Sequence, residues 1–166
     1  IGGVEQHVRD ICNGIKKNIS VICCNTKNKT SIEMIDDIKI TKYASLGIFA
    51  SLPISLPFIL NFRKQKADVL HFHLPNPLAV MSYFLFRIKG KILITWHADI
   101  TKQKIALFFY KPFLKWFLKR ADKIIVTSPN IIKSSPHLKK LKDKITVIPL
   151  GINPNDYLSI NLPKPT

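Results

Sequence analysis

The chain has 166 residues, 46% hydrophobic and 22% charged, which favours one folded domain with a sizeable core and argues against disorder. It carries 26 Lys and Arg against 10 Asp and Glu, a formal net charge of +16. This excess favours polyanionic partners, namely anionic membrane surfaces, nucleic acid or phosphorylated substrates, although an AT-rich genome is an alternative source of part of it. The three cysteines have no metal-ligand spacing, so we expect reduced, mostly buried thiols in a cytoplasmic protein.

Helical patterns and short apolar runs alternate along the chain. Helices are expected at 4–17, 55–66, 75–88, 102–120 and 130–134, and strands at 19–24, 38–43, 69–73, 91–96, 123–127 and 145–149. This alternation predicts an α/β fold, a doubly wound, Rossmann-like parallel sheet with helices on both faces. Ligands bind at the carboxyl ends of the strands in such sheets. The loops to examine are therefore 2–3, 73–76, 96–101, 128–130 and 150–153.

Gly2 and Gly3 open the first predicted helix, where free N–H groups and the positive end of the helix dipole can bind a phosphate. A tight turn without a ligand is the alternative. A doubly wound sheet normally begins with a central strand just before this loop, so we expect that the domain lacks its first strand. The apolar stretch 44–62 is interrupted by Pro53 and Pro57, and we therefore expect no transmembrane helix.

Five segments, taken in order, resemble glycosyltransferase family 4 (group 1), in particular bacterial enzymes that add mannose or rhamnose to surface polysaccharides. The segments are GGVEQH at 2–7, DVLHFHLPNP at 68–77, TWHADI at 95–100, ADKIIVTSPN at 121–130 and VIPLGIN at 147–153. The resemblance covers nearly the whole chain. It implies the N-terminal, acceptor-side half of a two-domain GT-B enzyme, truncated at its own N-terminus.

On this resemblance, the complete protein transfers a hexose with retention of configuration from a nucleotide sugar, such as GDP-mannose, to a lipid-linked saccharide. Neither a cofactor nor a catalytic metal is implied. Residues 1–152 would form the N-terminal domain, and 153–166 a linker toward a C-terminal nucleotide-sugar-binding domain that the chain lacks. We expect the chain alone to be inactive, and the enzyme to be cytoplasmic and peripheral on the inner face of the cell membrane.

The resemblance places His97 beside the transferred sugar and the Gly2–Gly3 loop at the donor diphosphate. His97 ends a predicted strand, and Asp99 follows two residues later, so we take both as candidate catalytic residues. Asp99 can orient His97, contact the acceptor hydroxyl or cap the next helix, and His97 can instead be a structural residue that positions the loop. The family motif more often has Ser at the position of Ala98 and Arg at that of Lys102.

His71 and His73 share one face of a predicted strand. Such a pair can bind zinc, but two further ligands would be needed and the sequence suggests none, so no metal site is predicted. His73 lies nearer the carboxyl end of the strand. The residues expected in the cleft for sugar or acceptor are His73, Asn76, Ser128 and Asn130, whereas His71 is expected in the core.

The predicted helix 102–120 contains six basic residues and no acidic one. At helical spacing four lysines form one stripe: Lys104, Lys111, Lys115 and Lys119. Apolar side chains fill roughly 200° of the remaining surface, more than the ~100° of a helix packed on one side, and Pro112 should kink the helix. We expect the stripe to contact an anionic membrane, with ordinary core packing as the alternative. The alternative function is a non-catalytic basic module that binds a membrane surface or nucleic acid, although no specific nucleic-acid motif is present.

Overall fold

The computed structural model describes residues 3–15, 18–49, 52–100 and 104–151. The described helices are α1 (Gly3–Ile15), α2 (Leu56–Phe62), α3 (Pro77–Phe86), α4 (Lys104–Arg120), α5 (Pro129–Ser134) and the 3-10 helix η1 (Lys142–Lys144). The described strands are β1 (Ser20–Cys24), β2 (Ser31–Ile35), β3 (Ile38–Tyr43), β4 (Ile48–Phe49), β5 (Leu52–Pro53), β6 (Val69–Leu74), β7 (Lys91–Trp96), β8 (Lys123–Val126) and β9 (Ile145–Val147).

A four-stranded sheet forms the centre of the C-terminal two thirds of the chain. Its strands pair in the order β6-β7-β8-β9 and all are parallel. Parallel neighbours need a crossover between them, which explains why a helix separates β6 from β7 and β7 from β8. Ile94, Ile124 and Val126 in these strands are fully buried. The predicted parallel α/β class is confirmed.

A second sheet differs from the prediction of one continuous sheet. β1 and β3 are parallel, but with β2 they form a separate three-stranded sheet in the order β1-β3-β2, in which β2 is antiparallel to β3. β1 and β6 are therefore edge strands of two sheets.

β2 is absent from the sequence prediction, and the turn that follows it explains why it forms. Asp36 and Asp37 both have positive φ, 50° and 63°, and Ile35 pairs directly with Ile38. Positive φ at both central residues is the two-residue hairpin turn that matches the twist of antiparallel strands, and Asp tolerates it. The two-stranded hairpin of β4 and β5 is likewise missing from the prediction.

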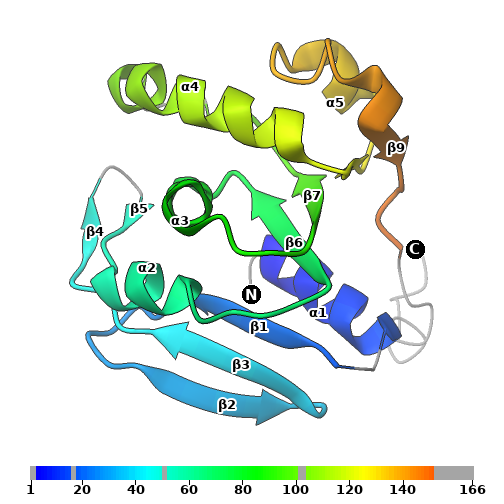
Figure 1. Ribbon diagram of the computed structural model, residues 1–166. Helices are drawn as coiled ribbons and strands as arrows, with labels where there is room; N and C mark the ends of the chain where they lie inside the picture. The colour runs from blue at the N-terminus through cyan, green and yellow to red at the C-terminus, as the bar shows by residue number, and fades with distance from the viewer. Residues whose placement is uncertain (1–2, 16–17, 50–51, 101–103, 152–166) are drawn as a thin grey trace, which may run out of the picture.

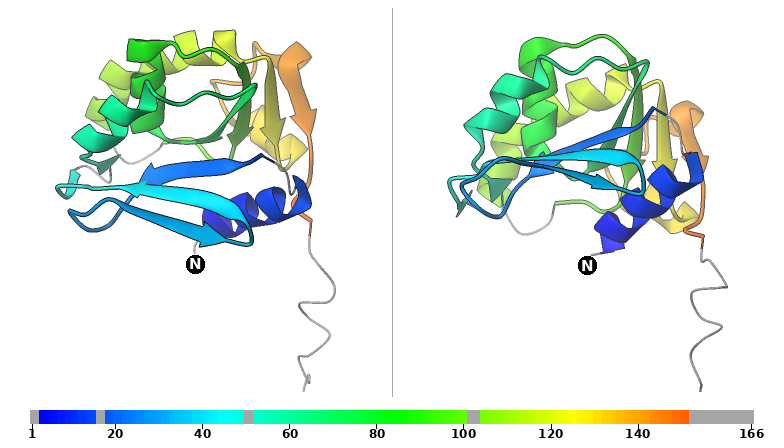
Figure 2. Two further views of the ribbon diagram at one scale, coloured as in Figure 1. Left: turned by 60° about the horizontal axis from the view of Figure 1, so that its bottom comes forward. Right: turned by 90° about the horizontal axis from the view of Figure 1, so that it is seen from below.

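Helices cover both sides of the sheets. α2, α3 and α4 lie together on one side and α1 lies on the opposite side (Figures 1 and 2). The core beneath α4 is aromatic: the fully buried ring of Phe117 lies 4.8 Å from that of Phe72 on β6 and 5.3 Å from that of Tyr83 on α3. These contacts fix α3 and α4 against β6 and so hold the carboxyl ends of the strands in place.

Among the described helices, α2, α3 and α5 each start at a side-chain cap with proline in the first turn. The Ser55 hydroxyl accepts a hydrogen bond from Phe58 N at 3.1 Å, and the Asn76 side chain accepts one from Ala79 N at 3.1 Å. With Asn76 as the cap, Pro77 takes the first helical position, where its missing N–H costs nothing. α3 therefore begins two residues later than predicted.

Candidate active site

The candidate site lies where β6 and β7 end side by side. His73 is the next-to-last residue of β6, and His97 follows the last residue of β7. The backbone N–H of His97 donates to the carbonyl of Leu74 at 2.9 Å, which extends the pairing one residue beyond β7. Both imidazoles thus lie at the carboxyl edge of the sheet, where this class of fold binds ligands.

A third histidine, His7, reaches the same place from α1. Its ring centroid lies 5.8 Å from that of His73 and 5.4 Å from that of His97, edge-on to both. His73 and His97 are stacked, with His73 Nδ1 3.1 Å from His97 Nε2, so one of these nitrogens carries the shared proton. We call His7, His73 and His97 the three-histidine cluster. Because His7 lies about one turn after Gly3, the start of α1 and His97 are at the same end of the sheet.

His71 contacts the three-histidine cluster through the ring of His73. Its Nε2 lies 2.8 Å from the hydroxyl of Thr95, which is fully buried, and its ring centroid is 4.4 Å from that of His73. The contact with Thr95 joins β6 to β7. His71 is therefore a half-buried, hydrogen-bonded residue between neighbouring strands rather than a fully buried core residue.

The buried imidazoles are neutral at physiological pH. Burial, with smaller contributions from neighbouring histidines, lowers the pKa of His71 to about 4 and that of His73 to about 3. Burial and the proximity of His7 also lower the pKa of His97. Neutral rings offer one N–H donor and one lone pair each, so the cluster can donate to a sugar hydroxyl or coordinate a cation.

Asp99 has a different partner from the one that the sequence suggests first. The hydroxyl of Ser135, at the end of α5, donates to Asp99 Oδ1 at 2.8 Å. The Asp99 charge also acts on His137, whose pKa is lowered by burial and raised in part by this carboxylate. Among the described contacts, the ring nitrogen of His97 has His73 as its partner, so orientation of His97 by Asp99 has no contact to support it.

The other predicted cleft residues lie at helix starts on the same edge. Asn76 caps α3, and the Ser128 hydroxyl caps α5 by accepting from the backbone N–H of Asn130 at 3.2 Å. Asn130 is exposed on the first turn of α5. Gly3 begins α1, and a Cβ there would meet open space, while Gly2 lies outside the described residues. Packing within the described part of the domain therefore does not require glycine at position 3.

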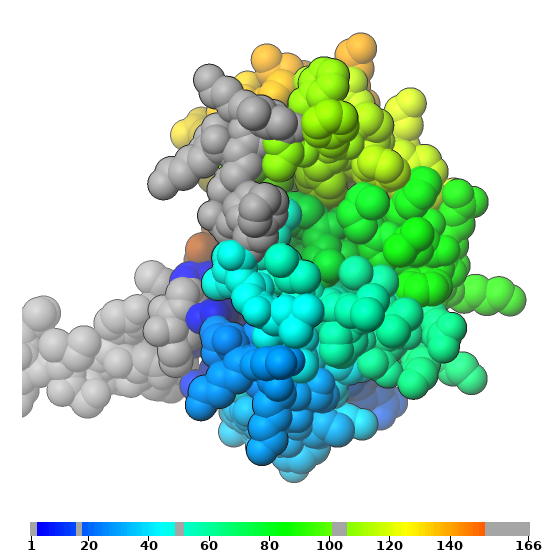
Figure 3. Space-filling model, turned by 90° about the vertical axis from the view of Figure 1, so that its left-hand side faces the viewer, coloured from blue at the N-terminus to red at the C-terminus, as the bar shows by residue number. Residues whose placement is uncertain are grey.

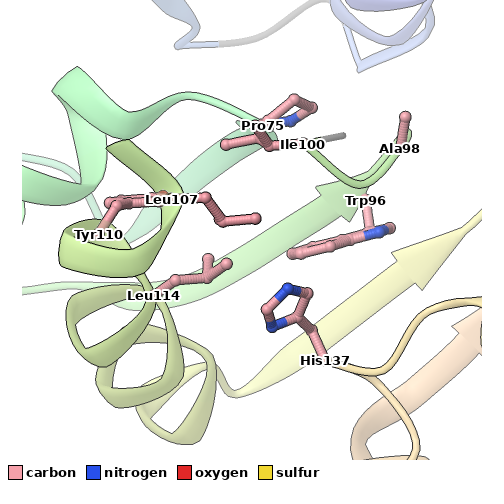
Figure 4. A pocket seen from close by; sticks show the side chains of 8 residues that line it. All are labelled: Pro75, Trp96, Ala98, Ile100, Leu107, Tyr110, Leu114 and His137. Atoms are coloured by element: carbon pink, nitrogen blue, oxygen red, sulfur yellow. The ribbon is translucent and has the colours of Figure 1, made fainter. Parts of the chain in front are cut away.

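An apolar pocket lies beside this edge, under α4 (Figure 4). It offers space for about one water molecule and is lined by Pro75, Trp96, Ala98, Ile100, Leu107, Tyr110, Leu114 and His137. The Trp96 indole N–H and the Tyr110 hydroxyl are buried without a hydrogen-bond partner among the described residues. The sequence analysis names neither Tyr110 nor His137.

α4 continues through Pro112 as one helix, and part of its lysine stripe is described. Lys111, Lys115 and Lys119 are exposed, while the Lys104 side chain lies outside the described residues. No helix in the described ranges is both long and apolar enough to cross a bilayer.

The Rossmann-like α/β topology, with side chains gathered at the carboxyl edge and a helix start beside them, defines a ligand-binding domain of the doubly wound class. The sequence model for Glycosyltransferase Family 4 matches residues 1–156, and the chain belongs to this family. The resemblance inferred from the motifs is thereby confirmed.

Two curated relatives are similar to this chain in sequence. The O-antigen chain mannosyltransferase C of Escherichia coli is 31% identical over 160 residues, which cover 93% of this chain and 43% of the relative. The D-rhamnosyltransferase WbpZ of Pseudomonas aeruginosa is 33% identical over 118 residues, 70% of this chain and 30% of the relative. The chain thus spans less than half the length of these relatives.

Proposed function

We propose that the chain is the acceptor-side half of a retaining hexosyltransferase of surface-polysaccharide synthesis. The enzyme would move mannose or rhamnose from a nucleotide sugar, such as GDP-mannose, to a lipid-linked saccharide. Membership of glycosyltransferase family 4 and the activities of the two relatives support this reaction class. The structural observation that carries the proposal is the convergence of His97 and the first turns of α1, whose His7 ring lies 5.4 Å from that of His97.

In this proposal residues 1–152 supply the acceptor surface and one wall of the catalytic cleft. Residues 153–166 lead to a C-terminal domain that binds the nucleotide sugar. α1 starts at Gly3, and the N–H groups and positive dipole at this helix start would bind the diphosphate, as the Gly2–Gly3 motif suggests.

Neutral, half-buried His97 donates a hydrogen bond to the transferred sugar, and His73 holds the His97 ring through the 3.1 Å contact. Asn76, Ser128 and Asn130 line the acceptor side at the starts of α3 and α5. Asp99, fixed by Ser135, is the remaining candidate contact for the acceptor hydroxyl.

The test uses the full-length enzyme. His97→Ala is expected to lower kcat by about 10²-fold or more while changing the donor Kd little, because a group that acts on developing charge matters most in the transition state. Lys66→Ala, an exposed residue before β6 at the opposite edge of the sheet, is the matched control and should retain parental kinetics. Unchanged kinetics for His97→Ala would show that His97 is structural.

A separate experiment tests whether sugar transfer requires a second domain. Incubated with GDP-mannose and lipid-linked acceptor, the 166-residue chain alone is expected to transfer no sugar. Turnover comparable to that of the full-length enzyme would refute the proposed need for a second domain.

We further propose that α4 places the enzyme on the cytoplasmic face of the cell membrane. Phe108 and Phe109 are 73% and 69% exposed, and Phe108 falls at helical spacing within the lysine stripe. Phe113 and Trp116 are instead covered by Phe84 of α3, at ring distances of 4.9 and 5.1 Å. The core therefore uses only part of the wide apolar arc, and two phenylalanines remain beside the lysines for a lipid surface.

The neighbouring elements continue this surface. Viewed from the side of the first turn of α4, the helix lies above α3 and α2, with the hairpin strands beside them (Figure 3). Exposed apolar side chains occur on the hairpin and α2: Leu46, Ile48, Ile54, Leu56 and Leu60. Each lysine near an anionic leaflet contributes about 1 kcal/mol, so four lysines could contribute several kcal/mol before ordering costs.

Vesicle sedimentation tests this contact. Binding to anionic vesicles should weaken with salt and fall when Lys104, Lys111, Lys115 and Lys119 are all changed to Gln. The charge-matched control changes four exposed lysines outside α2, α4 and the hairpin: Lys39, Lys123, Lys139 and Lys140. Equal losses in the two quadruple variants, or displacement from vesicles by duplex nucleic acid at low micromolar concentration, would make the charge a generic polyanion attractant.

A further inference from the structure

The three-histidine cluster has the spacing of a metal site. Within the described ranges, His7, His73 and His97 each offer one ring nitrogen, and these nitrogens all lie within 4.8 Å of one another. Tetrahedral zinc with bonds of about 2.0–2.1 Å places its ligand nitrogens about 3.3 Å apart. The 3.1 Å separation of His73 Nδ1 and His97 Nε2 already matches this value. The His7 nitrogen lies within 4.8 Å of the other two and would move closer to them on binding an ion.

The environment of His7 provides a second observation. Its Nε2 is buried and has no hydrogen-bond partner among the described residues. Leaving a buried polar atom without a partner is unfavourable, and native structures rarely do so. A metal ion in the cluster would satisfy this nitrogen. It would also replace the direct contact between His73 and His97, in which only one proton is shared.

The ligand types favour a particular class of ion. Three imidazole nitrogens suit Zn²⁺ and other late first-row divalent ions, whereas Mg²⁺ and Ca²⁺ require oxygen ligands. Three protein ligands leave a fourth position open to water or a small molecule, unlike the closed four-ligand sets of structural zinc sites. His73 and His97 come from paired strand ends and His7 from a helix, so the backbone fixes the spacing before an ion binds.

We propose that His7, His73 and His97 form a Zn²⁺-binding site with one open coordination position. The sequence analysis considers His71 as the partner of His73 and predicts no metal. The structure instead engages His71 with Thr95 and brings His7 and His97 to His73. Because Zn²⁺ would occupy the lone pair and hydrogen-bonding capacity of His97, it should inhibit sugar transfer. This consequence rests on the proposed function, whereas Zn²⁺ binding itself does not.

Binding is measured by isothermal titration of the EDTA-treated and dialysed chain with ZnCl₂. One Zn²⁺ per chain is expected, and His7→Gln, His73→Gln and His97→Gln should each weaken binding at least ten-fold. His137→Gln is the matched control, since this histidine lies outside the cluster, and it should bind Zn²⁺ within two-fold of the parent. His7→Gln is the decisive variant because a half-buried position on a helix tolerates Gln well. Parental affinity in folded His7→Gln, checked by circular dichroism, would overturn the proposal.

Co²⁺ substitution distinguishes the cluster from the thiols of Cys12, Cys23 and Cys24. Coordination by the cluster gives visible d–d absorption of four-coordinate intensity without thiolate-to-metal charge transfer in the near ultraviolet. Charge-transfer absorption at one equivalent of Co²⁺ would assign the ion to cysteine and overturn the proposal.

The two proposals fail in different ways. If Zn²⁺ binds the cluster and the full-length transferase keeps its activity, the metal site stands and the role of His97 in transfer is refuted. If His97→Ala loses activity but the parent binds no Zn²⁺, the transferase role stands and the metal site is overturned.

Discussion

Acidification should destabilise this fold through His71 and His73. Burial lowers their pKa values to about 4 and about 3, whereas histidine in an unfolded chain has a pKa near 6.5. Between these values the unfolded chain binds protons that the folded chain does not. The free energy of unfolding therefore rises with pH across this window. The contribution of the two histidines is complete above pH 6.5 and is lost progressively as pH falls below it.

The magnitude follows from the width of the window. From pH 7.5 to pH 5, each histidine passes through about 1.5 pH units below 6.5, which corresponds to about 2 kcal/mol of unfolding free energy. Together, His71 and His73 give about 4 kcal/mol, to within a factor of two because their rings are close neighbours. With an m-value of about 2 kcal/mol/M, the urea midpoint should fall by about 2 M.

The assay is urea unfolding followed by circular dichroism at several pH values, with EDTA present. The informative variant is His71→Gln, whose carboxamide can keep the hydrogen bond to Thr95 but cannot gain a proton. Between pH 7.5 and pH 5, the unfolding free energy of this variant should fall by about 2 kcal/mol less than that of the parent. His137→Gln should change the pH dependence of the unfolding free energy less than His71→Gln does, because Asp99 partly offsets the effect of burial on the pKa of His137. A His71→Gln profile parallel to that of the parent would refute the link between burial and acid sensitivity.

Two further predictions concern stability at neutral pH, measured as changes in the unfolding free energy from urea titrations. Phe117→Ala should cost about 3–5 kcal/mol because the fully buried ring packs against Phe72, whereas Phe108→Ala, at a 73% exposed position, should stay within about 0.5 kcal/mol of the parent. Gly90→Ala should cost more than about 1 kcal/mol, because φ is +140° there and a Cβ would lie 2.6 Å from the Ala67 carbonyl oxygen. Equal stabilities for Phe117→Ala and Phe108→Ala, or a neutral Gly90→Ala, would contradict the packing described here.

Much of the fold could be predicted because buried strands and capped helices leave local signals. The run 91–96 matches β7 residue for residue, and Asn76 with Pro77 defines the start of α3 once the cap is recognised. β2 was predictable too, since 31–35 precedes an Asp-Asp pair suited to a tight hairpin. The separation of the strands into two sheets was not predictable from local pattern, because pairing depends on which distant strands meet.

The candidate site shows the same division between local and long-range information. His73 and His97 could be singled out because each lies at a strand end, but their contact depends on the register that pairs His73 with Thr95. His7 is part of the GGVEQH motif. Helical periodicity shows which face of the helix carries His7, but not which strand ends that face contacts. The hydrogen bond between Ser135 and Asp99 spans 36 positions, so local sequence gave no reason to prefer it over His97.

The close packing of His7, His73 and His97 opposes protonation of more than one of the three rings. Two unit charges at the 5.4 Å ring separation would repel by about 3 kcal/mol at an effective dielectric constant of 20. The cluster is therefore compatible with neutral rings or with a bound cation that uses their lone pairs, but not with several protonated rings. A sugar hydroxyl, Zn²⁺ and protons accordingly compete for the same few nitrogen atoms.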